Sequence, residues 1–175
     1  MIEKYLSRTE FDSYEDFIEN YSVSIPNDFN FGFDVVDSWA ELDENKRALV
    51  WCDDEGQERT FTFKDISLLS NRAANMFKNL GVKKGDVVML ILRRRWEYWV
   101  CAVALHKLGA IMVPATLQLT KKDIVYRAES ANISTIVCVN DDFVVSQIEL
   151  AKKESSVIKN TLLVGAEREG FISFS

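Results

Sequence analysis

A run of three arginines is the most conspicuous group in this chain that could take part in chemistry. Arg93, Arg94 and Arg95 directly follow an unbroken apolar stretch, where a strand of a sheet is expected to end. Guanidinium groups at such a place can bind a phosphate or a carboxylate. The run also fits the solvated end of a strand, which is the simpler interpretation, and the sequence leaves both open.

The other reactive residue types form no recognisable catalytic group. His106 is the only histidine, and with Lys107 it lies near a predicted helix end, where positive groups interact favourably with the helix dipole. There is no second histidine, no G-x-S-x-G motif and no Cys/His pair at ligand spacing, so nothing indicates nucleophilic hydrolysis or a zinc site. We therefore predict no catalytic residue and no metal ligand within the chain.

The cysteines and glycines have structural explanations. Cys101 and Cys138 lie in apolar runs, and together with Cys52 we interpret them as reduced core residues. Gly81 and Gly85 fit a helix end and a turn. Neither G-x-G-x-x-G nor G-x-x-x-x-G-K-[ST] occurs, so the sequence predicts no phosphate-binding glycine loop.

Composition narrows the class of protein. The 175 residues are 47% hydrophobic and 27% charged, which is typical of a globular domain. With 27 acidic and 21 basic residues the net charge is −6, so we expect no nucleic-acid partner. No run of about 18 uncharged apolar residues and no signal-peptide pattern occurs, and we expect a cytoplasmic protein without a membrane span.

Hydrophobic periodicity predicts the elements that position these residues. Ser13 caps a first helix, and a second short helix directs Val35, Val36 and Trp39 inward after an aromatic entry at residues 29–33. An antiparallel hairpin over 47–52 and 58–62 then leads into a helix that Thr62 caps with Asp65. Four strands follow, separated by helices: residues 87–92, 110–113, 134–139 and 161–164, with helices over 96–108, 121–131 and 142–153.

Strands that alternate with helices of ten or more residues predict right-handed crossovers and a parallel sheet. The predicted fold class is therefore α/β, a doubly wound, mainly parallel sheet with flanking helices and an N-terminal β-hairpin. We expect residues 1–28 to form an N-terminal helical extension and residues 29–175 to form the α/β unit.

Four segments in this order resemble the AMP-forming acyl-CoA synthetases of the adenylate-forming superfamily, especially the medium-chain branch. They are Thr60-Phe61-Thr62-Phe63-Lys64-Asp65-Ile66, the turn and strand from Gly81 to Val88, the stretch from His106 to Ala115, and the stretch from Leu119 to Arg127. The resemblance extends from about Phe29 to Val164. It implies an incomplete part of the large N-terminal domain of that fold.

The resemblance implies that a parent enzyme uses ATP, Mg²⁺ and CoA to convert a carboxylic acid to acyl-CoA, AMP and pyrophosphate. The family's phosphate loop, nucleotide contacts and catalytic lysine would lie downstream of these residues. We therefore expect the isolated chain to be inactive and to bind none of these cofactors. Its expected partners are the remainder of the synthetase chain and, through apolar surface left uncovered, further copies of itself.

Gln118 is the one site residue that the resemblance supplies. It lies in the stretch 115–120, which follows the strand ending at Pro114 and precedes the helix capped by Thr120. In medium-chain synthetases the equivalent loop carries a glutamine that contacts CoA, and Gln118 occupies the matching position. A solvated loop residue is the alternative.

Two other functions stay open at this point. One is an α/β interaction module without catalysis, which the absence of catalytic motifs favours. The other is a fragment of an adenylate-forming enzyme that is not a CoA ligase.

Overall fold

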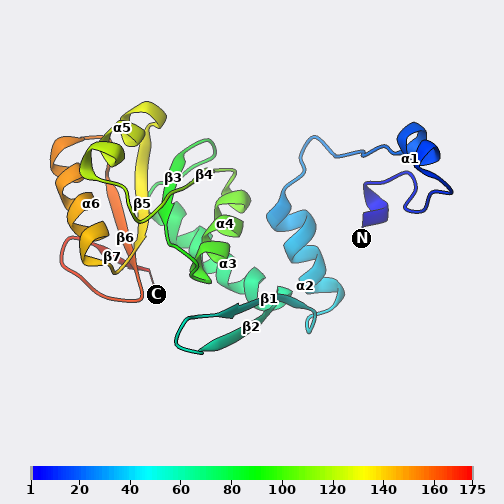
Figure 1. Cartoon of the computed structure of the whole chain (residues 1–175), viewed down its shortest axis with the longest axis horizontal. Coiled ribbons are helices and arrows are strands. Elements are labelled where there is room, and N and C mark those ends of the chain that lie inside the picture. The colour runs from blue at the N-terminus through cyan, green and yellow to red at the C-terminus, as the bar shows by residue number, and fades with distance from the viewer. Residues whose placement is uncertain (1, 175) are drawn as a thin grey trace.

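A parallel sheet forms the centre of the molecule and confirms the predicted α/β class (Figure 1). The structure is a computed structural model that describes residues 2–174. β3 (Val87–Ile91) pairs in parallel with both of its neighbours, β4 (Ile111–Pro114) and β5 (Ile133–Val139). β6 (Asn160–Val164) and β7 (Ile172–Phe174) continue the sheet beyond β5, so that the strand order is β4-β3-β5-β6-β7.

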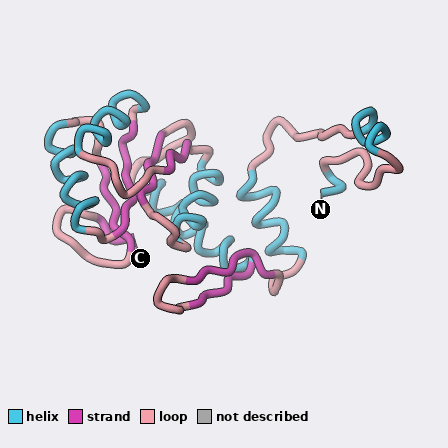
Figure 2. The backbone as a smooth tube through the Cα atoms, viewed as in Figure 1, coloured by secondary structure: helices cyan, strands magenta, loops and turns pink. Residues whose placement is uncertain are grey.

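Helices cover both faces of this sheet, as predicted for a doubly wound fold. α3 (Phe63–Asn79) and α4 (Glu97–Leu108) pack on one face, and α5 (Lys121–Ala131) and α6 (Asp142–Glu154) pack on the other (Figures 1 and 2). The glycine after α4, Gly109, has a φ of 67° and so adopts the left-handed conformation that ends the helix.

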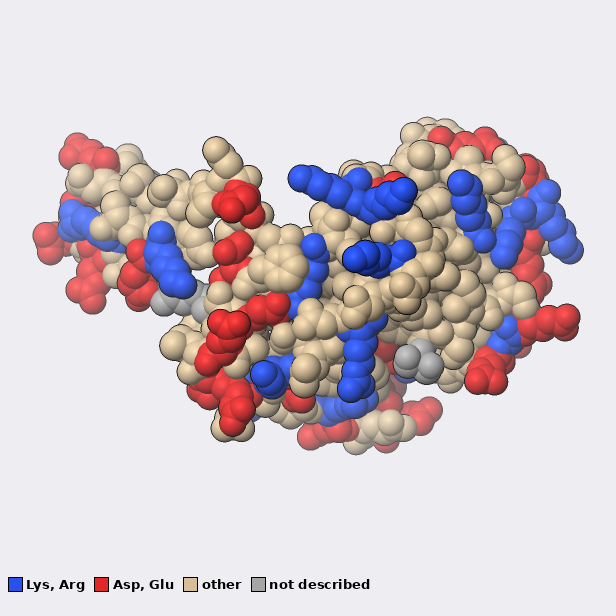
Figure 3. All heavy atoms as spheres, turned by 180° about the vertical axis from the view of Figure 1, so that it is seen from behind, with Lys and Arg blue, Asp and Glu red and all other residues tan. Residues whose placement is uncertain are grey.

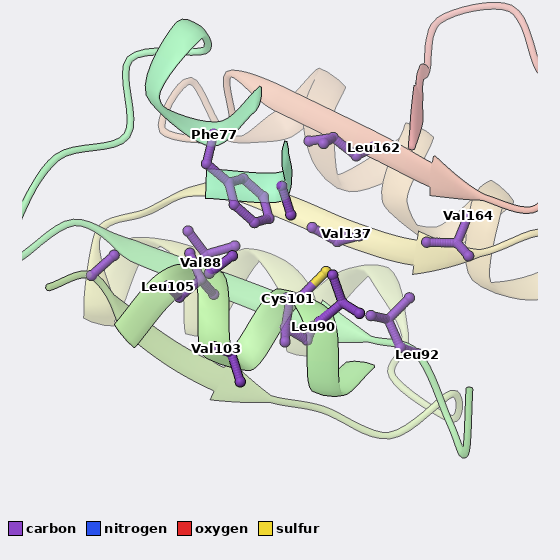
Figure 4. Packing of buried hydrophobic residues seen from close by; sticks show 14 of the residues in the cluster. Phe77, Val88, Leu90, Leu92, Cys101, Val103, Leu105, Val137, Leu162 and Val164 are labelled. Atoms are coloured by element: carbon purple, nitrogen blue, oxygen red, sulfur yellow. The ribbon is translucent and has the colours of Figure 1, made fainter. Parts of the chain in front are cut away.

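Alternate residues of β3 face two separate hydrophobic cores. Val88 and Leu90 pack with residues of α3 and α4, among them Phe77 (Figure 4). Met89 and Ile91 belong to the core that α5 and α6 cover. Because both faces are buried, every position of the strand needs an apolar side chain, which explains the unbroken apolar run in the sequence.

β7 is an element that the sequence analysis missed. It has three residues and lies at the edge of the sheet, where Ile172 is exposed. A strand of this length is too short to show the period of two by which strands are recognised.

The hairpin of β1 (Arg47–Cys52) and β2 (Glu58–Thr62) forms a separate two-stranded sheet. The indole N–H of Trp51 donates a hydrogen bond of 2.7 Å to the carbonyl of Arg94, which fixes the hairpin to the turn after β3. At its other end β2 runs directly into α3, where Thr62 and Asp65 form the predicted capping box.

The N-terminal arm, residues 2–28, extends away from the sheet (Figures 1 and 2). It contains the short helix η1 (Ile2–Lys4) and α1 (Tyr14–Asn20), which Ser13 caps as predicted and which has no buried residue. Residues 1–28 hold seven acidic and two basic residues, so most of the net charge lies here, and acidic side chains are scattered over this part in Figure 3.

The second helical segment begins earlier than predicted. A π-helix, η2 (Phe31–Asp37), precedes α2 (Ser38–Leu42), so that Phe31 and Phe33 are part of the helix rather than an extended entry. The side-chain oxygen of Asn30 accepts hydrogen bonds from the N–H groups of Gly32 and Phe33 and so starts the helix at this point.

A buried lysine attaches η2 to the rest of the fold. The Lys107 side chain is only 3% exposed, and its ammonium group donates hydrogen bonds of 2.7 Å to Asp37 and to Asn71. A Cβ atom at Gly32 would lie 2.5 Å from Cγ of Lys107, so the close approach of η2 to α4 requires glycine there. This contact joins segments that are distant in the sequence, whereas the cap at Asn30 is a local signal of the helix start that the sequence analysis missed.

Candidate functional site

The carboxyl ends of the parallel strands are where α/β sheets bind their ligands. β4 and β5 follow β3 in the chain but lie on opposite sides of it, so the direction of strand order changes at β3. The turn after β3 carries the three arginines, and the loop after β4 carries Gln118. The structure therefore brings the two predicted candidate segments to the same edge of the sheet.

The three arginines have different surroundings. The guanidinium group of Arg95 donates two hydrogen bonds, of 2.7 and 3.1 Å, to the carboxylate of Glu97. This bidentate contact raises the pKa of Arg95. Glu97 is 5% exposed, so this pair is largely structural. Arg93 and Arg94 are exposed, as expected for a solvated strand end, and remain available to a ligand.

The loop that carries Gln118 has a fixed base and an exposed tip. The N–H of Ala115 donates a hydrogen bond of 2.9 Å to the carbonyl of Leu90, and Leu119 is buried in the core. Gln118 itself is exposed in a turn, where its backbone N–H lies 3.4 Å from the hydroxyl oxygen of Thr116. Its side-chain amide can both donate and accept hydrogen bonds to a ligand.

Two cavities flank the arginine turn. One, of about 530 Å³, lies between the turn and the hairpin and is lined by both acidic and basic residues, among them Asp53, Glu58, Arg59 and Arg93. The other, of about 360 Å³, lies between the turn and the loop after β4, and Thr116 is among its lining residues. Sequence reasoning could not find these cavities, because they are formed by segments that only the folded chain brings together.

The remaining reactive residues lie apart from this edge. His106 is exposed at the end of α4, where its ring packs edge-on against Phe31 with centroids 5.6 Å apart. Cys101 and Cys138 are buried, and burial raises the pKa of the Cys138 thiol to about 12 and that of Cys101 still further. The prediction was wrong for Cys52, which is exposed because the thin hairpin has an outer face open to solvent.

Residues 2–174 lack a cluster of metal ligands and a helix that could span a membrane. In this part of the chain no group of three or more His, Cys, Asp and Glu residues could hold a metal ion. None of its helices combines the length and the apolar character needed to cross a membrane.

Curated relatives share about a third of their aligned residues with this chain. The mitochondrial acyl-coenzyme A synthetase ACSM3 of Mus musculus is 33% identical over 168 residues, which cover 92% of this chain and 29% of the relative. The mitochondrial acyl-coenzyme A synthetase ACSM4 of Rattus norvegicus is 34% identical over 157 residues, which cover 86% of this chain and 27% of the relative. The chain thus spans less than a third of the length of these relatives.

A solved structure has the same arrangement of elements. The anthranilate CoA ligase AuaEII, determined in complex with anthranoyl-AMP, superimposes with a TM-score of 0.75 and 25% sequence identity. The match covers 86% of this chain and 28% of the ligase. The fold expected from the sequence resemblance is therefore confirmed.

A family model described as AMP-binding enzyme matches residues 36–171. This range runs from within η2 to the residue before β7, and it includes both the arginine turn and the loop with Gln118. The chain belongs to the AMP-binding enzyme family.

Proposed function

We propose that this chain is the N-terminal portion of an AMP-forming acyl-CoA synthetase. The parent enzyme would activate a carboxylic acid with ATP and Mg²⁺ to an acyl-adenylate, release pyrophosphate and transfer the acyl group to CoA. The observation that carries the proposal is the 33% identity over 168 residues to an acyl-coenzyme A synthetase. The fold shared with a CoA ligase that holds an acyl-adenylate supports the same assignment.

The isolated chain is proposed to be inactive. Its candidate edge offers cationic and hydroxyl groups, but the described residues there include no pairing of a nucleophile with a base and no glycine loop around a phosphate. The ATP and Mg²⁺ contacts are therefore assigned to the remainder of the parent chain. That remainder is the proposed partner of this unit.

Carboxylate-dependent exchange of labelled pyrophosphate into ATP tests both statements. The parent should catalyse exchange with a range of carboxylic acids and should form a CoA thioester that mass spectrometry detects, whereas the 175-residue chain should do neither. Exchange without thioester formation would indicate an adenylate-forming enzyme that is not a CoA ligase. Neither activity in the parent would favour a non-catalytic module.

Gln118 is the proposed CoA contact. Its exposed amide at the carboxyl edge of the sheet is available to the ligand, while the fixed base of the loop limits the freedom that binding would remove. In the parent, Gln118→Ala should raise the KM for CoA about fivefold, as expected for the loss of one hydrogen bond between neutral groups. The adenylation half-reaction should remain unchanged.

Gln57→Ala is a matched control, because Gln57 is also an exposed glutamine but lies at the hairpin turn. An equal loss in both half-reactions for Gln118→Ala would show that the loop serves folding. An unchanged KM would show that Gln118 makes no contact with CoA.

A further inference from the structure

Three side chains that can donate hydrogen bonds line the cavity of about 360 Å³ at the carboxyl ends of β3 and β4. They are Arg93, Tyr98 and Thr116, and the other lining residues are apolar or proline: Leu90, Leu92, Pro114 and Ala115. Arg93 carries the only charge in this lining. Arg93 also lines the separate cavity on the other side of the turn, together with the acidic residues of the hairpin.

Arg93 has a strained backbone. Its φ is 52°, in the left-handed region that residues with a Cβ atom adopt only at a cost. The other described residue of this kind, Asn132, ends α5, a position at which asparagine is common. Arg93 has no such local explanation, and residues held in this way are often found at functional sites.

The ion pair of Arg93 does not explain the strain. Its guanidinium group lies 3.9 Å from Asp54, and the two side chains are 66% and 96% exposed. Exposed pairs of this kind contribute little to stability. The guanidinium group is therefore exposed beside the turn, without a contact that contributes much to the stability of the fold.

The hydroxyl groups of the cavity have hydrogen-bonding capacity to spare. Among residues 2–174, no hydrogen bond to the Tyr98 hydroxyl group is present, although the residue is half-buried. The Thr116 oxygen accepts only the long bond of 3.4 Å from Gln118, so its proton remains free to be donated. A guanidinium and two hydroxyl groups suit an oxyanion, and the carboxylate near them, that of Asp54, is 96% exposed and only weakly paired with Arg93.

We propose that this cavity binds a phosphate group and that, in the parent synthetase, the phosphate belongs to CoA. The second half of this statement rests on the proposed function. Thr116 and Gln118 lie in one loop, so the same loop would contact two polar parts of a single ligand. Arg93 would bind the phosphate oxygens through its planar guanidinium group.

The first test uses the 175-residue chain and inorganic pyrophosphate at constant ionic strength. Backbone amide signals of residues 92–98 and 114–118 should shift in ¹H–¹⁵N NMR spectra on titration. Arg93→Gln should weaken binding about tenfold or more, as expected for a hydrogen bond between charged groups. Arg94→Gln is the matched control, because Arg94 is also exposed but does not line the cavity, and it should weaken binding less than about twofold.

A second variant separates binding from folding. Arg93→Gly should abolish the shifts and raise the melting temperature, because glycine adopts a positive φ without strain. A lower melting temperature would show that Arg93 serves the fold, and would overturn the proposal. Equal losses for Arg93→Gln and Arg94→Gln, or no shifts in the wild-type chain, would also overturn it.

The parent enzyme distinguishes the sources of the phosphate. Arg93→Gln should raise the KM for CoA at least about fivefold and leave the KM for ATP unchanged. A change confined to ATP would overturn the assignment to CoA. Pyrophosphate binding by the chain together with an inactive parent would support the cavity and refute the proposed function.

Discussion

The thiol groups differ in reactivity because their surroundings differ. The thiolate is the form that reacts, and burial both raises the pKa of Cys101 and Cys138 and blocks access to them. At pH 8 a maleimide should therefore label Cys52 alone in the folded chain. Mass spectrometry of tryptic peptides measures this, and labelling of all three in 6 M guanidinium chloride is the control.

The same difference in labelling between Cys52 and the two buried cysteines should hold at pH 9, because that pH is still well below the pKa of about 12 for Cys138. Rapid labelling of Cys138 at that pH would contradict the burial described for β5.

Lys107 is the residue on which the attachment of η2 depends most. Asp37→Ala removes the carboxylate from a lysine that is 3% exposed and leaves Asn71 as its hydrogen-bond acceptor. We expect a loss of about 2 to 3 kcal/mol in the free energy of unfolding, because the ammonium group stays buried without its counter-charge. Urea unfolding followed by tryptophan fluorescence measures the loss.

Glu154→Ala is the control for that measurement. This substitution breaks the ion pair between Lys121 and Glu154, whose side chains are 39% and 52% exposed. It should therefore lower the free energy of unfolding by less than about 1 kcal/mol. Similar losses for both variants would contradict the burial of the Lys107 ammonium group.

At the level of the elements, α3 depends on its capping box. The hydroxyl oxygen of Thr62 accepts a hydrogen bond of 3.1 Å from the N–H of Asp65, and the Asp65 carboxylate accepts one of 2.9 Å from the N–H of Thr62. Thr62→Ala should lower the free energy of unfolding by about 1 kcal/mol. Thr9→Ala, at an exposed threonine of the arm, should change it by less than about 0.5 kcal/mol.

Much of the fold could be predicted because its signals are local. The capping pair Thr62 and Asp65, the terminating Gly109 and the apolar run of β3 each act within a few residues of the element they define. Parallel pairing followed from the alternation of these strands with helices. β7 could not be predicted, because it is too short to show a strand period and is defined only by its pairing with β6. The early start of η2 was missed although Asn30 caps it locally, while its attachment through Lys107 is a distant contact that no local pattern shows.

The candidate site was only partly predictable for the same reason. The sequence indicated Arg93 and Gln118 separately, one from its charge and one from a family resemblance. It could not indicate Tyr98 or Thr116, because a tyrosine in a helix and a threonine in a loop carry no signal until the turn after β3 meets the loop after β4. The strained backbone of Arg93 is likewise a property of the fold.

For the molecule as a whole, the boundary expected after residue 28 can be tested by deletion. α1 has no buried residue, and the aromatic contacts of Phe11, Phe17 and Tyr21 lie within the arm. The chain 29–175 should therefore unfold within about 2 °C of the full chain, since little apolar burial is lost. Deletion through residue 42 should lower the melting temperature clearly, because it also removes Asp37 and η2.

Exposed apolar side chains of the arm favour association between copies of the chain. Ten large apolar side chains are exposed between Tyr14 and Leu42, and six of them belong to the arm. We expect the full chain to associate with increasing concentration and the chain 29–175 to associate less, as measured by sedimentation velocity. Identical sedimentation of both chains at all concentrations would contradict this.

The strand order has a consequence for synthesis on the ribosome. β3 emerges first, β4 then adds to one of its edges and β5 to the other, and β6 and β7 each add to the strand made just before them. No strand has to enter between two strands that are already paired. The sheet can therefore grow outward in the order of translation, and a nascent chain in which β5 but not yet β6 has emerged from the ribosome exposes the outer edge of β5.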